Sequence, residues 1–371
     1  MGSLPSPSPP PPPSPPSSAE YRMYMAICGR TPSSHTKFCN WIESYNPWDN
    51  SWNCVGPIPG IPERHVLRGF AMVAVADSIY IVGGRLCYRG EEDGAEEVNL
   101  AVLATVRRYS VTTRAWSECA ALGTPRFDFA CTVCDGKIYA AGGQISVASG
   151  RGVSSAEVYY PAEDAWGPLP GMRTVRYKCV GVTWEGKVYV VGGFAEGGDS
   201  DGRTVTFAAE RSSAEAFDVS RGEWELMPRM WRLDVPPNQI VAVDGKLYSS
   251  GDCLNPWKGH VESYDGKLNI WNSVDGSRRR SFFFSSSSAS SSGSPVTNEA
   301  TQRIYLTMAP VGTQLYFLAG YRLEGEDHRS VSVVHAFDTS AGQGEEAWMC
   351  MEPTEEEGEK ELCGHCCVIQ L

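Results

Sequence analysis

Groups that could bind a metal or carry a lipid are concentrated at the end of the chain, in "CGHCCVIQL" (363–371). Zinc prefers thiolate ligands, and a site here would combine the local thiols with one from another strand: Cys363, Cys366 and Cys367 with Cys131 or Cys134. A prenylation signal needs a cysteine fourth from the end, where this chain has Val368. Neighbouring strand residues point to opposite faces, which would separate the thiols. We expect residues 365–371 to form a β-strand, with zinc and lipid as the alternatives.

Charge and composition exclude several classes of protein. The net charge is −12, and the stretches 91–97 and 352–361 contribute −5 each. The remainder is near neutral, so a nucleic-acid partner is not expected. No run of about 18 apolar residues is present, so no membrane partner is expected either. With 38 glycines and 25 prolines, most of the chain is too interrupted for long helices, which favours an all-β fold.

The N-terminal stretch and the cysteine count point to a location inside the cell. Residues 1–21 are rich in proline and serine, lack the pattern of a signal peptide, and are predicted to be a disordered leader. Thirteen cysteines without a regular spacing suit a reducing compartment. We expect the protein in the cytoplasm, with the nucleus as a second compartment.

A repeated segment runs through the chain. It consists of a turn, an apolar strand containing tyrosine, and a glycine pair or its remnant. The five copies are "DSIYIVGG" (77–84), "DGKIYAAGG" (135–143), "EGKVYVVGG" (185–193), "DGKLYSSGD" (244–252) and "GTQLYFLAG" (312–320). Asp-Gly is a strong signal for a two-residue hairpin, so an apolar strand should precede each copy.

A second signature follows each copy: an aromatic residue and a later tryptophan. The pairs are Tyr109/Trp116, Tyr159/Trp166, Phe217/Trp224, Tyr264/Trp271 and the wider Phe337/Trp348. Each unit is therefore predicted to contain four short strands. Together these signatures resemble kelch repeats, which implies a β-propeller built from four-stranded blades.

A sixth unit is split between the two ends of the chain. Tyr45/Trp52 is a sixth aromatic–tryptophan pair, and "MYMAICGR" (23–30) resembles the glycine-pair strand loosely. This unit lacks its innermost strand, which residues 365–371 could supply. We therefore expect a six-bladed kelch β-propeller over residues 22–371, closed by its C-terminal strand and interrupted by a disordered inter-blade loop at 277–298.

The long loops are predicted to share one face with the connections between blades, and we expect partners to bind there. This face would carry residues 85–105, 194–213 and 350–363. Both acidic stretches fall on it and could either keep the protein soluble as disordered loops or attract a basic partner. The acidic candidates for partner binding are Glu91, Glu92, Asp93, Glu96, Glu97, Glu355, Glu356 and Glu357.

Three arginines complete the candidate binding residues. Arg68, Arg126 and Arg176 each stand nine residues before the first residue of the predicted turn, at 77, 135 and 185. They should ring the mouth of the central channel. There they could bind partner carboxylates through paired hydrogen bonds, or they could bridge adjacent blades.

No catalytic pattern is present. The six histidines are scattered, and there is no P-loop, dinucleotide fingerprint or nucleophile elbow. The iron-dependent specifier proteins share the kelch fold and use a Glu-x-x-x-Asp-x-x-x-His pattern. Glu324, Glu326, Asp327 and His328 have the wrong spacing for it. We expect a non-catalytic protein without a cofactor.

The stretch "NPWDNSWNCVGPIPGIPERHVLRGFAMVAVADSIYIVGGRLC" resembles plant F-box/kelch proteins, in particular the group that marks phenylpropanoid and flavonoid enzymes for ubiquitin-dependent degradation. The resemblance implies a substrate-recognition propeller whose protein partner could be a biosynthetic enzyme. About 20 Pro/Ser-rich residues precede the first predicted strand, so no F-box is expected and recruitment of a cullin ligase is doubtful. The alternatives are a general kelch scaffold unconnected with ubiquitin and a metal-dependent kelch enzyme.

Overall fold

The structure is a computed structural model in which all regular elements of the described residues are β-strands. It describes residues 20–29, 40–90, 96–148, 150–194, 196–198, 204–206, 211–233, 235–253, 261–274, 302–322, 329–341 and 347–371. The predicted leader, apart from its last two residues, and the predicted loop at 277–298 lie outside these ranges. No helix in the described part is long and apolar enough to cross a membrane.

The two ends of the chain form one antiparallel sheet, the terminal sheet, in the order β3-β2-β1-β30. The C-terminal strand pairs with β1, as expected, but it is longer than residues 365–371 and begins at Lys360. The strands are β1 (Tyr21–Gly29), β2 (Trp41–Asn46), β3 (Ser51–Pro57) and β30 (Lys360–Gln370).

The second sheet has the order β10-β9-β6-β5, and a small three-stranded sheet, β4-β7-β8, accompanies it. The second sheet contains β5 (Ala71–Val75), β6 (Ser78–Val82), β9 (Val106–Ser110) and β10 (Ala115–Cys119). The small sheet contains β4 (His65–Arg68), β7 (Arg85–Tyr88) and β8 (Val98–Val102). The stretch 85–105, expected to be a loop, therefore supplies two strands.

The third and fourth sheets each have four strands in a simple antiparallel order. The third sheet contains β11 (Ala130–Cys134), β12 (Lys137–Ala141), β13 (Ala156–Tyr160) and β14 (Ala165–Leu169). The fourth contains β15 (Val180–Trp184), β16 (Lys187–Val191), β19 (Ala214–Asp218) and β20 (Glu223–Met227). Between its second and third strands, β17 (Glu196–Gly198) pairs with β18 (Thr204–Thr206).

The fifth and sixth sheets complete the set. The fifth contains β21 (Ile240–Val243), β22 (Lys246–Ser249), β23 (Glu262–Asp265) and β24 (Ile270–Ser273). The sixth contains β25 (Gln302–Val311), β26 (Gln314–Arg322), β27 (Arg329–Asp338) and β28 (Trp348–Cys350), and β29 (Thr354–Glu357) also pairs with β27. The segment at 352–361, one of the two acidic stretches expected as loops, is thus largely strand.

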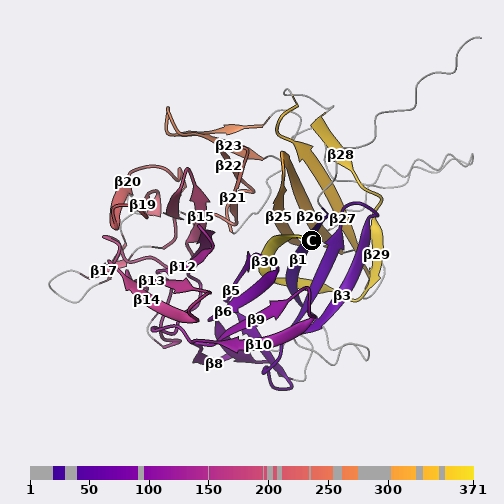
Figure 1. Cartoon of the computed structure of the whole chain (residues 1–371), viewed down its shortest axis with the longest axis horizontal. Helices are drawn as coiled ribbons and strands as arrows, with labels where there is room; N and C mark the ends of the chain where they lie inside the picture. Colours follow the sequence, from indigo (N-terminus) through magenta and orange to yellow (C-terminus); the bar gives the residue numbers. More distant parts are fainter. Residues whose placement is uncertain are drawn as a thin grey trace, which may run out of the picture.

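The six sheets follow one another around the molecule, and the yellow end of the chain returns beside the indigo start (Figure 1). One edge strand of each sheet, here called its first strand, contacts the first strands of the two neighbouring sheets. These contacts join β30 to β5, β5 to β11, β11 to β15, β15 to β21, β21 to β25 and β25 to β30. Each main core cluster lies between two neighbouring sheets rather than at one centre. One cluster joins the terminal and second sheets, and another joins the sixth and terminal sheets.

Both repeated signatures have a local structural cause. Asp135 and Gly136 have φ angles of 49° and 70°, as a type I′ hairpin turn requires. Within each sheet the aromatic residue and the tryptophan face each other across adjacent strands; their ring centroids are 4.8 Å apart for Tyr45 and Trp52. The same pairing occurs at Phe337 and Trp348 despite the wider spacing in the sequence.

The glycine pair is required where neighbouring sheets approach each other. Gly142 has a φ of 71°, and a Cβ added to it would lie 2.7 Å from the carbonyl oxygen of Arg176 in the next sheet's leading segment. Gly143 donates its N–H to the same carbonyl at 2.8 Å. The repeat in the sequence thus records a backbone-to-backbone junction between sheets.

Candidate partner-binding face

The segments before the first strands and after the glycine pairs lie at one end of the sheets, which we call the long-loop face. On this face each leading segment pairs with the segment that follows the glycines, as β4 does with β7 and Phe127 does with Gln144. The hairpin turns, such as Asp135–Gly136, lie at the opposite end of the strands.

Arg126 and Arg176 are buried and do not offer their side chains to a partner. Their exposed fractions are 1% and 0%. The guanidinium of Arg126 donates to the carbonyl oxygens of Gly142 and Ser155 at 2.7 and 3.1 Å, and it forms an ion pair with Glu157 at 2.6 Å. Of the two interpretations that the sequence left open, the geometry favours the structural one for these two arginines.

The buried arginines connect neighbouring sheets. The carbonyl of Arg126 accepts the N–H of Gly84 from the preceding sheet, while its guanidinium binds within its own sheet. Arg176 does the same, with its carbonyl on Gly143 and its guanidinium on Gly192 and Ser213. A guanidinium suits this position because its fixed N–H groups can satisfy several acceptors at once.

The acids that meet these cations repeat through the chain, and the sequence interpretation missed them. Each stands two residues before the aromatic residue of its unit's aromatic–tryptophan pair, in Glu-x-Tyr or Glu-x-Phe, and each is buried: Glu43, Glu157, Glu215 and Glu262. Their cationic partners are Lys360, Arg126, Arg176 and Arg232, respectively. The Glu-x-aromatic spacing was a signal that could have identified them.

Arg68 is not the counterpart of Arg126 and Arg176. The turn of the second sheet consists of Ala76 and Asp77, with the positive φ of 52° at Ala76, so it begins one residue earlier than expected. Leu67 therefore takes the position of the buried arginines and is itself fully buried. A shift of one residue turns a strand side chain to the other face, which sends Arg68 in a different direction.

Arg68 lies at the junction of the small sheet and the terminal sheet, inside a charged cluster. It binds Glu97 through two nitrogens, at 3.0 and 2.7 Å, and Glu361 at 2.8 Å. Arg89 also binds Glu97, at 2.8 Å. Burial alone would raise the pKa of Glu97, but the hydrogen bonds from Arg68 and Arg89 lower it to about 2. Glu97 thus neutralises cations of its own chain.

The second acidic stretch is also paired internally in part. Glu356 accepts from the hydroxyl of Ser332 at 2.9 Å and forms an ion pair with Lys360, which in turn binds Glu43. Burial alone would lower the pKa of Lys360, but the two carboxylates raise it. The electrostatic attraction available to a partner is therefore smaller than the sequence charge suggests.

The other acidic candidates are either exposed or outside the described part of the structure. Glu96 is exposed, two residues before β8, and Glu355 is exposed on β29. Glu357 belongs to β29, and its side chain lies outside the described part of the structure. Glu91, Glu92 and Asp93 lie outside the described residues.

Apolar side chains are exposed on the same face. Val98 and Leu100 on β8 have exposed fractions of 55% and 48%, and Ile145 and Val147 follow the glycine pair of the third sheet. Within the described residues β8 pairs only with β7, so its other edge presents unpaired backbone groups. No sequence signal identified these residues.

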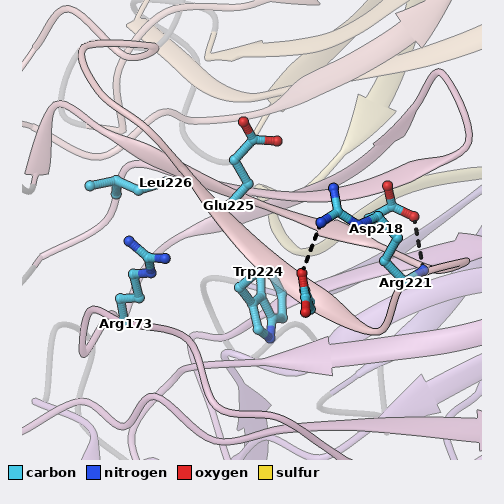
Figure 2. A pocket seen from close by; sticks show the side chains of 7 residues that line it. Arg173, Asp218, Arg221, Trp224, Glu225 and Leu226 are labelled. Carbon is cyan, nitrogen blue, oxygen red and sulfur yellow. Dashed lines mark hydrogen bonds and ion pairs between the residues drawn. The ribbon is translucent and has the colours of Figure 1, made fainter.

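A shallow pocket lies away from this face, beside the β19–β20 hairpin (Figure 2). Its walls carry opposite charges that pair with each other, since Arg221 binds Glu223 at 3.2 Å. Trp224 is buried beneath and donates its indole N–H to the carbonyl of Pro170. The described residues that line the pocket include no serine, threonine, cysteine or histidine.

The C-terminal thiols do not converge. Cys367 packs between the terminal and second sheets, whereas Cys366 packs towards the sixth sheet. Cys363 packs against the cluster of Cys28 and Cys87 and also against the cluster that contains Cys367. Among the described residues no group of three or more Cys, His, Asp or Glu side chains is arranged to hold a metal ion.

Comparison with known proteins agrees with this architecture. The Kelch motif matches residues 125–173 and 176–230, which contain the third and fourth sheets. The F-box/kelch-repeat protein At1g16250 of Arabidopsis thaliana is 31% identical over 191 residues, 52% of this chain and 46% of that protein. F-box/kelch-repeat protein At1g67480 of the same plant is 32% identical over 237 residues, 61% of this chain and 54% of that protein.

An animal protein shows a weaker similarity. Kelch-like protein 26 of Danio rerio is 25% identical over 216 residues, 56% of this chain and 32% of that protein. The chain spans about half the length of the two plant relatives it matches. The matched motif, the four-stranded sheets and these similarities together lead to one conclusion: the chain carries kelch repeats and is homologous to the F-box/kelch-repeat proteins of plants.

Proposed function

We propose that this chain is a non-catalytic protein-binding module that holds a partner protein on its long-loop face. The observation that carries the proposal is β8, an edge strand with two exposed apolar side chains beside an exposed acid. Val98 and Leu100 offer apolar area, the free edge offers backbone hydrogen bonds, and Glu96 adds a charge. Strand addition to such an edge is a common mode of peptide recognition.

The six sheets are proposed to be the blades of a closed kelch propeller. The circuit of contacts between first strands and the pairing of β30 with β1 support this. A closed ring would fix the second sheet against the terminal sheet and so hold the β4-β7-β8 sheet in place. The binding edge would then sit on a rigid scaffold, which reduces the entropy lost on binding.

The similarity to plant F-box/kelch-repeat proteins suggests which class of protein the chain binds. We propose substrate recognition of the kind implied by F-box/kelch-repeat proteins, with a biosynthetic enzyme, such as one of phenylpropanoid metabolism, as the bound protein. The proposed location is the cytoplasm, with the nucleus as a second compartment. Whether the chain acts in ubiquitination depends on a cullin adaptor joining the complex. A general scaffold role is the second candidate, supported by the similarity to Kelch-like protein 26.

The test is affinity capture from plant extract with matched surface variants. Val98→Ser with Leu100→Ser removes exposed apolar area from β8 without opening a core. Leu268→Ser with Ile270→Ser does the same at the β23–β24 hairpin, at the other end of the sheets. We expect the first variant to lose a partner protein that wild type and the second variant retain. Equal recovery of all partners by both variants would contradict binding through this face.

The same capture separates the candidate roles. A cullin or its adaptor recovered with a biosynthetic enzyme would support substrate recognition for ubiquitination. Actin or signalling proteins without the ligase would support the scaffold role. The acids Glu97 and Glu356 are kept intact in these variants, because neutralising them would disturb ion pairs inside the chain.

A further inference from the structure

Three thiols meet where the first and last strands of the chain pair. Cys28 of β1 and Cys87 of β7 are buried against Val66, and Cys363 of β30 packs against this group. Cys28 and Cys363 are near enough that each thiol shifts the pKa of the other. Both are free, and Cys363 is only half-buried, so a small oxidant can reach it.

Cys363 lies at an irregularity in the pairing of the two terminal strands. The pairing of β1 with β30 shifts in register between Ala26 and Ile27, which face Gly364 and Leu362. Cys363 is therefore the extra residue on β30 at this point. Such an irregularity can re-aim a side chain without breaking the strand.

Two guanidiniums flank the pair of thiols. Nη1 of Arg68 lies 3.4 Å from Sγ of Cys363, and Nη2 of Arg89 lies 3.8 Å from Sγ of Cys28. Glu361 lies 3.9 Å from Sγ of Cys28 and, with Glu97, balances the two cations. The hydrogen bond from Cys363 lowers the pKa of the Cys28 thiol despite its burial, whereas burial raises the pKa of Cys363. Positive charge beside a thiol pair favours thiolate, which is the nucleophile in oxidation.

We propose that Cys28 and Cys363 form a reversible disulfide when the protein meets a peroxide, and that this bond links the N-terminal strand to the C-terminal strand. The inference does not rest on the proposed protein-binding function. It assigns a modification site to residues that lie outside β8, the strand proposed to bind the partner.

The reaction needs only hydrogen peroxide as oxidant. The Cys363 thiol passes its proton to the neighbouring Cys28 thiolate, and its sulfur attacks one peroxide oxygen. The O–O bond breaks, and the departing hydroxide takes up that proton to become water. The Cys28 thiolate then attacks Sγ of the resulting sulfenic acid, the S–O bond breaks, and a second water leaves. Two thiols lose two electrons and two protons in total, and the peroxide is reduced to two waters.

The bond would join strands that are more than 300 residues apart in the chain, as residues 28 and 363 are. A cross-link that encloses so long a loop restricts the unfolded chain strongly. It would also prevent β30 from leaving β1. Oxidation would thus hold the pairing of the chain ends, and reduction would release it.

The experiment treats the full, reduced protein with hydrogen peroxide, blocks remaining thiols with an alkylating agent, and maps the unreduced peptides by mass spectrometry. We expect a linked pair of peptides containing Cys28 and Cys363, lost after dithiothreitol. The melting temperature of the oxidised protein should rise by about 5 °C, an order-of-magnitude expectation for a long-range cross-link. Arg89→Gln should slow formation of the link several-fold, because it removes a positive charge beside Cys28.

Matched variants make the result specific. Cys54→Ser, at an exposed thiol on β3, should leave the link unchanged, and Cys363→Ser should abolish both the link and the rise in melting temperature. Peptide mapping of the wild type decides the question even if a cysteine variant fails to fold. Recovery of Cys28 and Cys363 as free thiols while the exposed Cys54 and Cys350 are oxidised would overturn the proposal, and so would a link from Cys28 to Cys87.

Discussion

The buried ion pair between Arg126 and Glu157 tests how the segment that leads into the third sheet is held in place. Their side chains are exposed by only 1% and 7%, so each charge depends on the other and on fixed backbone partners. Glu157→Gln leaves a buried guanidinium without its counter-charge and should destabilise the protein by about 3–5 kcal/mol. Arg126→Leu leaves a buried carboxylate that keeps the N–H of Gly123 and should cost a similar amount, about 3–5 kcal/mol.

The double variant should be less damaging than the sum of the two. With both changes no buried charge remains, and the main loss is the donors to the carbonyls of Gly142 and Ser155, about 1–3 kcal/mol in each case. The second sheet provides a precedent, because Leu67 and Arg107 stand where Arg126 and Glu157 stand in the third sheet. The coupling between the two substitutions should therefore offset part of their sum, by about 1–3 kcal/mol.

The assay is urea unfolding followed by tryptophan fluorescence and circular dichroism for wild type, both single variants and the double variant. Arg221→Leu with Glu223→Gln is the control, because those partners are 71% and 69% exposed and should contribute nothing measurable. Single effects below about 1 kcal/mol, or a double effect equal to the sum within about 0.5 kcal/mol, would refute the reasoning.

Three further predictions test the junctions between sheets and the closure of the fold. Gly142→Ala and Gly136→Ala both place alanine at a positive φ, near 70°, but only at Gly142 would the new Cβ meet a backbone oxygen, at 2.7 Å. The melting temperature of Gly142→Ala should therefore fall well below that of Gly136→Ala. Equal losses would show that the close approach is unimportant. The folded-state pKa of Glu97, about 2, is below its ordinary value of 4.5, so its stabilisation is complete above pH 4.5 and is lost as the pH falls from there towards 2. Over that window wild type should lose about 3 kcal/mol more than Glu97→Gln in urea titrations at successive pH values, and parallel curves would contradict the assignment. Deleting residues 363–371 removes most of β30 and exposes the edges of β1 and its neighbours, so soluble monomer should be lost; a monomeric product with an unchanged melting temperature would exclude the closed ring.

The repeated signatures in the sequence were sufficient to predict the turns, the strands and the cross-strand aromatic pairs. Asp-Gly turns, tyrosine-containing strands and aromatic–tryptophan pairs depend on neighbours within about thirty residues, and the pairs at Tyr109/Trp116 and Phe217/Trp224 occur as expected. The wider spacing of Phe337 and Trp348 did not hide the pair, because cross-strand packing depends on register rather than on loop length. The pairing of the chain end with β1 was also predictable. The unit that contains Tyr45 and Trp52 lacked its innermost strand, and the apolar residues 365–371 belonged to no other unit.

The candidate site was less predictable, because its chemistry depends on which face each side chain takes. Arg68 and Arg126 stand at the same distance from their predicted turns, yet a turn that begins one residue earlier sends them to different places. From the sequence, the two acidic stretches are expected to be unpaired charges. In the structure, Glu97 forms an ion pair with Arg68, and Glu356 forms one with Lys360.

The sequence by itself determined the strand units, their four-stranded pattern and the meeting of the chain ends, because those follow from side-chain period and turn chemistry. Only the tertiary structure decided which charges are buried between sheets, that β8 is an exposed apolar edge, and that Cys28 and Cys363 touch. These facts depend on contacts between residues far apart in the chain. The energies of these contacts depend on how deeply the residues are buried and how far apart they lie, which no local sequence pattern specifies.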